Sequence, residues 1–93
     1  MVKHIVLFNV KEGEDAAKVA SIAAAHLEPL VGQIPGLIKL EVRKTFAGAD
    51  FVLYSEVEDM AAMAVYADHP LHTEAKSHFF HLLSSRTAAD YEV

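Results

Sequence analysis

A tyrosine and two histidines surround a proline in the segment Tyr66–His72, which reads Tyr-Ala-Asp-His-Pro-Leu-His. Histidine is the side chain whose ordinary pKa lies closest to neutral, so a histidine that faces a pocket can move protons. Proton transfer is therefore the chemistry that this segment suggests. The same residues also fit a plain junction between two helices, and the pattern alone leaves both interpretations open.

The proline places that junction. His69 precedes Pro70 and is pushed out of the helical conformation, whereas Pro70 suits the first turn of a new helix. We expect this helix to run to about Ser84 or Ser85. At about 100° per residue, His72 lies roughly 30° from the centre of an apolar stripe formed by Ala75, Phe79, Leu82 and Leu83. A histidine on a buried stripe needs a hydrogen-bond partner or a cavity, so His72 is either a satisfied core residue or a site residue.

Other candidate chemistry is weaker. His4 lies among apolar neighbours, and a core histidine bonded to backbone is its simplest interpretation. His69/His72 and His78/His81 are spaced by three residues, but no acidic residue completes a recognisable set of metal ligands. We therefore assign no metal ligands among the side chains and no bound cofactor, and a haem site is no better supported. No Ser-His-Asp arrangement is evident.

Length and composition bound the class of protein. The 93 residues are enough for one domain, residues 1–93, whose core is thin. Yet 53% of the residues are hydrophobic and none is cysteine, so self-association as a homodimer is the simplest way to hide the excess apolar surface. The net charge of -5 and the scattered basic residues argue against nucleic acid as a partner. Without a signal peptide or an apolar span, we expect a soluble, cytoplasmic protein with no membrane partner.

The hydrophobic periodicity predicts six elements. Strands are expected at Val2–Val10, Leu37–Phe46, Phe51–Val57 and Thr87–Val93. Helices are expected from Glu14-Asp15 to Gly32 or Pro35-Gly36, with Pro29 disturbing the end, over Met60–Ala67, and again from Pro70. The order βαββαβ, with the second helix broken in two, is the ferredoxin-like plan of the α+β class, a four-stranded antiparallel sheet with helices on one face.

The strands also indicate what covers the sheet. Val2–Val10 is apolar on both faces, with His4, Val6, Phe8 and Val10 on one side, so it should be central. In Leu37–Phe46 the residues Ile38, Leu40, Val42 and Phe46 should be buried and the alternate residues wet, as near an edge. Helices cover only one face of such a sheet. Packing the bare face against a second copy would bury it, which is an independent reason to expect a dimer.

Four segments together resemble one known family. They are VKHIVLF at the start, FVLYSEVED at Phe51–Asp59, YADHPLH at the helix junction, and the terminal DYEV. In order and spacing the chain resembles the stress-responsive α/β-barrel proteins, also called Dabb proteins. The resemblance implies a ferredoxin-like protomer and a homodimer whose two sheets pack into an α/β barrel. Many members have no assigned activity.

An enzymatic branch of the family, typified by olivetolic acid cyclase, is similar at three residues. The resemblance implies His72 as a catalytic base, His4 as an orienting or donating group, and Tyr66 as a pocket donor, acting in the intramolecular aldol condensation of a linear polyketide. Such a reaction needs a base for a carbon-bound proton and a donor for the carbonyl oxygen. Leu27 stands where that branch has a second pocket tyrosine, and the adjacent His26 should point elsewhere.

The sequence leaves three functions open. The first is a small dimeric protein that binds an apolar ligand or serves a stress role. The second is a cyclase or lyase that uses His72, His4 and Tyr66. The third is a metal- or haem-dependent protein. The resemblance also implies that a structural magnesium ion could be held by the backbone carbonyls of Val31, Ile34 and Leu37, a site that side-chain identity cannot test.

Overall fold

The structure is a computed structural model that describes all residues, Met1 to Val93. It confirms the α+β class and the predicted ferredoxin-like order of elements. The strands are β1 (Val2–Val10), β2 (Leu37–Lys44), β3 (Phe51–Val57) and β4 (Leu83–Glu92). The helices are α1 (Ala16–Leu27), α2 (Met60–Asp68) and α3 (Pro70–Lys76), with short 3₁₀ turns η1 (Glu28–Leu30) and η2 (Phe80–Leu82). None of these helices is long and apolar enough to cross a membrane.

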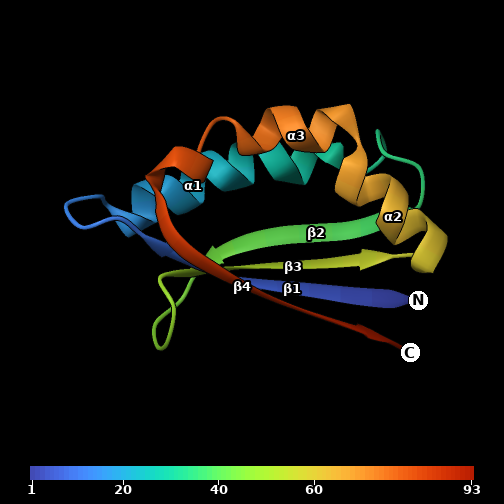
Figure 1. Cartoon of the computed structure of the whole chain (residues 1–93), viewed down its shortest axis with the longest axis horizontal. Coiled ribbons are helices and arrows are strands. Elements are labelled where there is room, and N and C mark those ends of the chain that lie inside the picture. The colour runs from blue at the N-terminus through green and yellow to red at the C-terminus, as the bar shows by residue number, and fades with distance from the viewer.

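The sheet is antiparallel throughout, with strand order β2-β3-β1-β4. As predicted, β1 is central and β2 lies at an edge. All helices cover the same face of the sheet, and the opposite face is bare (Figure 1). On β1, Val6 and Phe8 are buried beneath the helices, whereas Leu7 on the other face is 42% exposed. The alternation along β1 therefore separates a covered side from a bare side, and His4 belongs to the covered side.

Side-chain caps and prolines set the helix ends. The Asp15 carboxylate accepts hydrogen bonds from the amides of Ala17 and Lys18, and the Asp59 carboxylate accepts one from Ala62. The first helix is shorter than predicted, since α1 ends at Leu27 and Pro29 lies in the following 3₁₀ turn. Pro29 has no N–H to continue the ladder of helical hydrogen bonds.

The prediction that the last helix runs to Ser84 or Ser85 is wrong. Helix α3 ends at Lys76, and β4 begins at Leu83 instead of at the predicted Thr87. The Ser77 hydroxyl donates to the Glu74 carbonyl, a local bond that competes with helix continuation. The chain beyond η2 instead pairs with β1, whose Val10 lies opposite Leu83. The ladder with the central strand supplies the backbone hydrogen bonds of this segment in place of helical ones.

The predicted buried face of β2 is also partly wrong. Leu40 and Val42 are buried as expected, but Ile38 is 44% exposed and Phe46 is fully exposed. The ladder between β2 and β3 shifts register between Leu37 and Lys39, and such a bulge breaks the strict alternation of faces. Leu37 takes the buried place instead of Ile38. Phe46 lies beyond the end of β2, in the turn that leads to β3.

Gly36 fixes the approach of α2 to the start of β2, and its replacement tests that packing. A Cβ built on Gly36, whose φ is +84°, would lie 2.5 Å from the Cβ of Ala62. Gly48 has a similar φ of +83° but open space around it. Gly36→Ala should therefore cost about 2–4 kcal/mol of unfolding free energy and Gly48→Ala about 1 kcal/mol, since only the first adds a clash to backbone strain. Urea unfolding measures the free energy lost in each variant. Equal losses in the two variants would contradict the close packing of α2 against Gly36.

Candidate active site

A cavity of about 220 Å³ lies between the covered face of the sheet and the helices. Nine of its 13 lining residues are hydrophobic, and the full set is His4, Val6, Phe8, Leu27, Leu53, Met63, Tyr66, Ala67, His72, Lys76, Phe79, Phe80 and Arg86. His4, Tyr66 and His72, the three candidate residues from the sequence, thus all lie in the wall of one cavity. They come from β1, α2 and α3, so the broken second helix supplies two of them.

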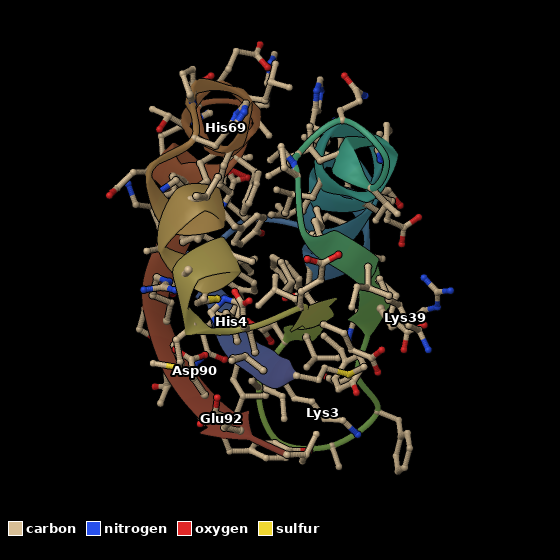
Figure 2. The ribbon with its side chains drawn as sticks, turned by 90° about the vertical axis from the view of Figure 1, so that its right-hand side faces the viewer. Lys3, His4, Lys39, His69, Asp90 and Glu92 are labelled. Carbon is tan, nitrogen blue, oxygen red and sulfur yellow. The ribbon has the colours of Figure 1, made fainter.

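His4 is held by a carboxylate on the neighbouring strand. Asp90 lies directly opposite His4 in the ladder between β1 and β4, and its Oδ1 accepts a hydrogen bond from His4 Nδ1. Figure 2 shows the two residues side by side beneath α2. Because the carboxylate accepts from Nδ1, Nε2 is the ring nitrogen left free to face a ligand. His4 is buried and Asp90 is about half exposed, so Asp90 orients His4 without itself lining the cavity.

Tyr66, a residue of the cavity wall, carries an unsatisfied hydroxyl. The residue is 1% exposed, and its hydroxyl oxygen is buried without a hydrogen-bond partner. Burial raises the pKa of the phenol, against a smaller lowering by Arg86, so the hydroxyl keeps its proton at neutral pH. Nearly all buried polar groups have partners. The Tyr66 hydroxyl is therefore a buried donor without an acceptor, on a residue that lines the cavity.

His72 stacks on Tyr66 and is neutral. The two ring centres are 4.2 Å apart at an interplanar angle of 26°, and the His4 ring lies 6.2 Å from Tyr66, edge to face. His72 Nδ1 lies 3.4 Å from the Ala67 carbonyl oxygen, which can only accept, so Nδ1 carries the proton and Nε2 the lone pair. Partial burial, and then the charge of Lys76, lower the pKa of His72 to about 4. At neutral pH the ring can therefore accept a proton.

His26, His69 and His78 make contacts outside the cavity. His69 caps α3, where its Nδ1 accepts from the amide of Leu71 at 3.1 Å, as the junction interpretation predicts. It lies far from His4 in Figure 2. His26 does not line the cavity, since its ring stacks on His78 at 3.6 Å, and Leu27 faces the cavity instead. The expectation that His26 points elsewhere is confirmed.

The row of residues across the sheet at His4 is not a nucleophilic triad. Ser55 lies opposite His4 on β3, and Asp90 lies opposite it on β4. The Ser55 hydroxyl, however, is fully buried, lies outside the cavity wall and makes no hydrogen bond to His4. The arrangement supports proton transfer by histidine and not attack by serine.

Residues 2–93 match the stress-responsive A/B barrel domain family, Dabb. The chain belongs to this family. The match includes every residue of the cavity wall, so the resemblance carried by the four sequence segments is confirmed. No curated protein matches the Dabb chain.

Solved structures agree with the fold of this Dabb domain. A dimeric protein of unknown function with a ferredoxin-like fold from Bacteroides fragilis is 30% identical, with 99% of this chain and 95% of that chain covered and a TM-score of 0.88. The protein At3g17210 from Arabidopsis thaliana is 25% identical, with 100% and 95% covered and a TM-score of 0.84. A hydroxynitrile lyase from Passiflora edulis is 17% identical, with 99% and 92% covered and a TM-score of 0.81, which is a likeness of fold alone.

The implied magnesium ligands of the Dabb domain lie away from the cavity. None of Val31, Ile34 and Leu37 lines it. Carbonyl oxygens are hard ligands that suit Mg²⁺, but the Ile34 carbonyl already accepts the amide of Leu37 at 3.2 Å, and the chain contains no cluster of three acidic, His or Cys side chains. An ion at this turn would be held by backbone and water, and it would be structural with respect to the cavity.

Sequence reasoning missed three residues at the site. Asp90 was present in the DYEV segment but was not linked to His4. In an antiparallel pairing the start of β1 must face the end of β4, and that register would have brought the two together. Lys76 and Arg86 are scattered charges in the sequence, yet both line the cavity. Arg86 precedes Thr87, the predicted start of the last strand, so the alternation of that strand assigns it to neither face.

Proposed function

We propose that this Dabb domain is an acid–base enzyme that removes a proton from a carbon atom next to a carbonyl group. His72 is the base, the Tyr66 hydroxyl donates to the carbonyl oxygen, and His4, positioned by Asp90, protonates or orients the second reacting group. The observation that carries the proposal is that Tyr66, whose hydroxyl lacks a partner, stacks on the neutral His72 imidazole and that both residues line one cavity. A carbonyl oxygen that becomes an enolate would supply the missing partner.

The step balances within these groups. Nε2 of His72 takes the proton, the electrons of the broken C–H bond form a carbon–carbon double bond, and the carbonyl oxygen gains the negative charge next to Tyr66. In an aldol cyclisation the nucleophilic carbon then attacks a second carbonyl of the same molecule. The resulting alkoxide takes a proton from His4 or from the His72 imidazolium. No oxidant, reductant or metal is needed.

The cavity limits the substrate to a small, largely apolar ketone. A cavity of about 150 Å³ accepts a benzene molecule, so 220 Å³ suits a ligand of about ten non-hydrogen atoms. Leu27 and the other hydrophobic residues make most of the wall. A short linear polyketide is the substrate class that fits both the size and the proposed aldol chemistry.

A second candidate function is the binding of a small apolar ligand without catalysis. The apolar wall favours it, and the Bacteroides fragilis relative has no described activity. The fold does not discriminate, because one fold hosts many functions. A hydroxynitrile lyase shares this fold. The two candidates differ in whether bound ketones exchange protons.

Deuterium exchange tests the proposal. 5-Oxohexanoate and 2-hexanone carry exchangeable protons on the carbons beside the ketone, and both fit the cavity by size. We expect the protein in D₂O to accelerate their exchange above the buffer rate in a saturable way, measured by loss of proton NMR signals. A cavity that binds both compounds without accelerating exchange would establish the second candidate instead.

We further propose that two copies pack their bare sheet faces together to form an α/β barrel. Cross-strand partners place Ile5, Leu7, Val52, Tyr54 and Ala89 on this face. Leu7 is 42% exposed there, and the face has no helix over it (Figure 1). The Bacteroides fragilis relative is dimeric. A contiguous apolar face of this kind is typical of an interface.

Leu7→Lys should convert the dimer into a monomer, because each copy would have to bury an unpaired charge in the interface. Light scattering should give the unaltered protein a mass twice the 10.2 kDa of one chain and the variant a mass near 10.2 kDa. Leu71→Lys is the matched control, since Leu71 is similarly exposed but lies on α3 and not on the bare face. It should stay dimeric. A mass of 10.2 kDa for the unaltered protein would refute the dimer.

A further inference from the structure

Lys76 and Arg86 give the cavity wall a positive charge that no acidic residue in the wall balances. The titratable side chains in the wall are these two cations together with His4, Tyr66 and His72. The ion pairs of the chain involve Arg43, His4 and His78, so neither Lys76 nor Arg86 has a partner. The chain as a whole carries a net charge of -5, which makes this local excess of positive charge distinctive.

The two cations come from two different walls of the cavity. Lys76 ends α3, one helical turn after His72, so the two share a face of the helix. Arg86 lies opposite Phe8 in the ladder between β1 and β4 and so projects on the covered side of the sheet. The Lys76 ammonium lies 5.2 Å from the centre of the Phe80 ring, and Phe80 also lines the cavity. A group placed between the two walls can meet both charges.

Both cations also shift the pKa of a proposed catalytic group. Lys76 contributes to the low pKa of His72, after burial, and Arg86 opposes the raised pKa of Tyr66. An anion bound between Lys76 and Arg86 would offset these charges. It would therefore raise the pKa of His72 toward its ordinary value and make the imidazole a stronger base.

We propose that the cavity binds an anionic amphiphile, with a carboxylate or phosphate head group held by Lys76 and Arg86 and a short apolar chain that lies along the hydrophobic wall. The proposal deepens the proposed function and rests on it, since the carbon acid is then part of an anionic molecule. Lysine and arginine are the residues that recognise such head groups. The cavity volume limits head and chain together to about ten non-hydrogen atoms.

Three probes of one chain length test the proposal. Hexanoate and hexanamide have the same shape and differ in charge, and hexyl phosphate carries the other head group. Affinities are measured by NMR titration of the full chain. We expect hexanoate or hexyl phosphate to bind at least tenfold more tightly than hexanamide, and the stronger of the two identifies the head group. The tighter probe should also raise the pKa of His72, which hexanamide should not.

The variant Lys76→Gln/Arg86→Gln should remove the preference and leave hexanamide binding unchanged, which also shows that the cavity is intact. Lys11→Gln/Lys18→Gln removes the same charge from exposed positions outside the cavity wall and should keep the preference. Equal affinity of all three probes for the unaltered protein, or no binding of any, would overturn the proposal. So would a preference that survives in the variant without Lys76 and Arg86.

Failure of this inference is distinguishable from failure of the proposed function. If exchange of 2-hexanone depends on His72 but 5-oxohexanoate exchanges no faster, the result supports the proposed enzyme and contradicts the anion site. If the protein prefers anionic probes but catalyses exchange of neither ketone, the result supports the anion site and contradicts the catalytic function.

Discussion

Replacing His72 with alanine should lower the catalysed exchange of 5-oxohexanoate by about 10²–10⁴-fold, which is the usual contribution of a positioned acid or base. His72 lines the cavity, and its pKa of about 4 keeps the ring neutral throughout the physiological range. Its Nε2 lone pair is free because Nδ1 faces the Ala67 carbonyl. Proton NMR exchange rates, measured under saturating ketone, provide the comparison.

Two further variants make the result specific to the base. His72→Gln preserves most of the volume and should lose as much activity as the alanine variant, so a packing defect cannot explain the loss. His81→Ala removes an exposed histidine outside the cavity and should exchange at the unaltered rate. Activity in both His72 variants within a factor of about two of the unaltered protein would exclude His72 as the base.

Tyr66→Phe should lower the activity without lowering the stability of the protein. The hydroxyl is buried without a partner, so its removal should leave the unfolding free energy unchanged or raise it by about 1 kcal/mol. Exchange should fall by about 10²–10³-fold, because the enolate oxygen loses its hydrogen-bond donor. Urea unfolding and NMR exchange rates on the same samples measure the two effects.

Tyr54→Phe is the matched control for the loss of a phenol. The Tyr54 hydroxyl donates to Glu56 Oε2 at 2.6 Å on the bare face of the sheet, outside the cavity. Loss of the Tyr54 hydroxyl should lower the free energy of unfolding and leave ketone exchange unchanged, which is the reverse of the result expected for Tyr66. A Tyr66→Phe variant that is clearly destabilised, with unaltered exchange, would show that the Tyr66 hydroxyl has a structural partner and no catalytic one.

Alternation and turn residues predicted most of the fold. Val2–Val10 and Phe51–Val57 were predicted with the bounds that the structure has, because both are apolar runs bounded by turns or by a cap. The end of α3 was not predictable from the apolar stripe. The same residues, Phe79 to Leu83, suit a helix face and a turn into a strand, and pairing with β1 decides between them. The exposure of Ile38 likewise depends on a bulge between two strands, which no local pattern records.

The sequence indicates which residues line the candidate site but not their protonation or hydrogen bonding. The resemblance to the Dabb family singled out His4, Tyr66 and His72, and the structure places all three in one cavity wall. Their states depend on neighbours that are distant in sequence. Asp90, 86 residues from His4, holds one imidazole, and burial keeps the other neutral. Such contacts follow from strand register and packing, which side-chain types alone do not define.

The pH dependence of ketone exchange by the unaltered protein tests the acid–base site most directly. His72 has a pKa of about 4, below its ordinary value, so the ring stays neutral as the pH falls through 6.5 and gains a proton only near 4. With the buffer rate subtracted, exchange of 2-hexanone, which carries no charge to perturb His72, should be level from about pH 8 to about pH 5 and should fall toward pH 4. A loss of activity centred near pH 6.5, or no catalysed exchange at any pH, would contradict the proposed function.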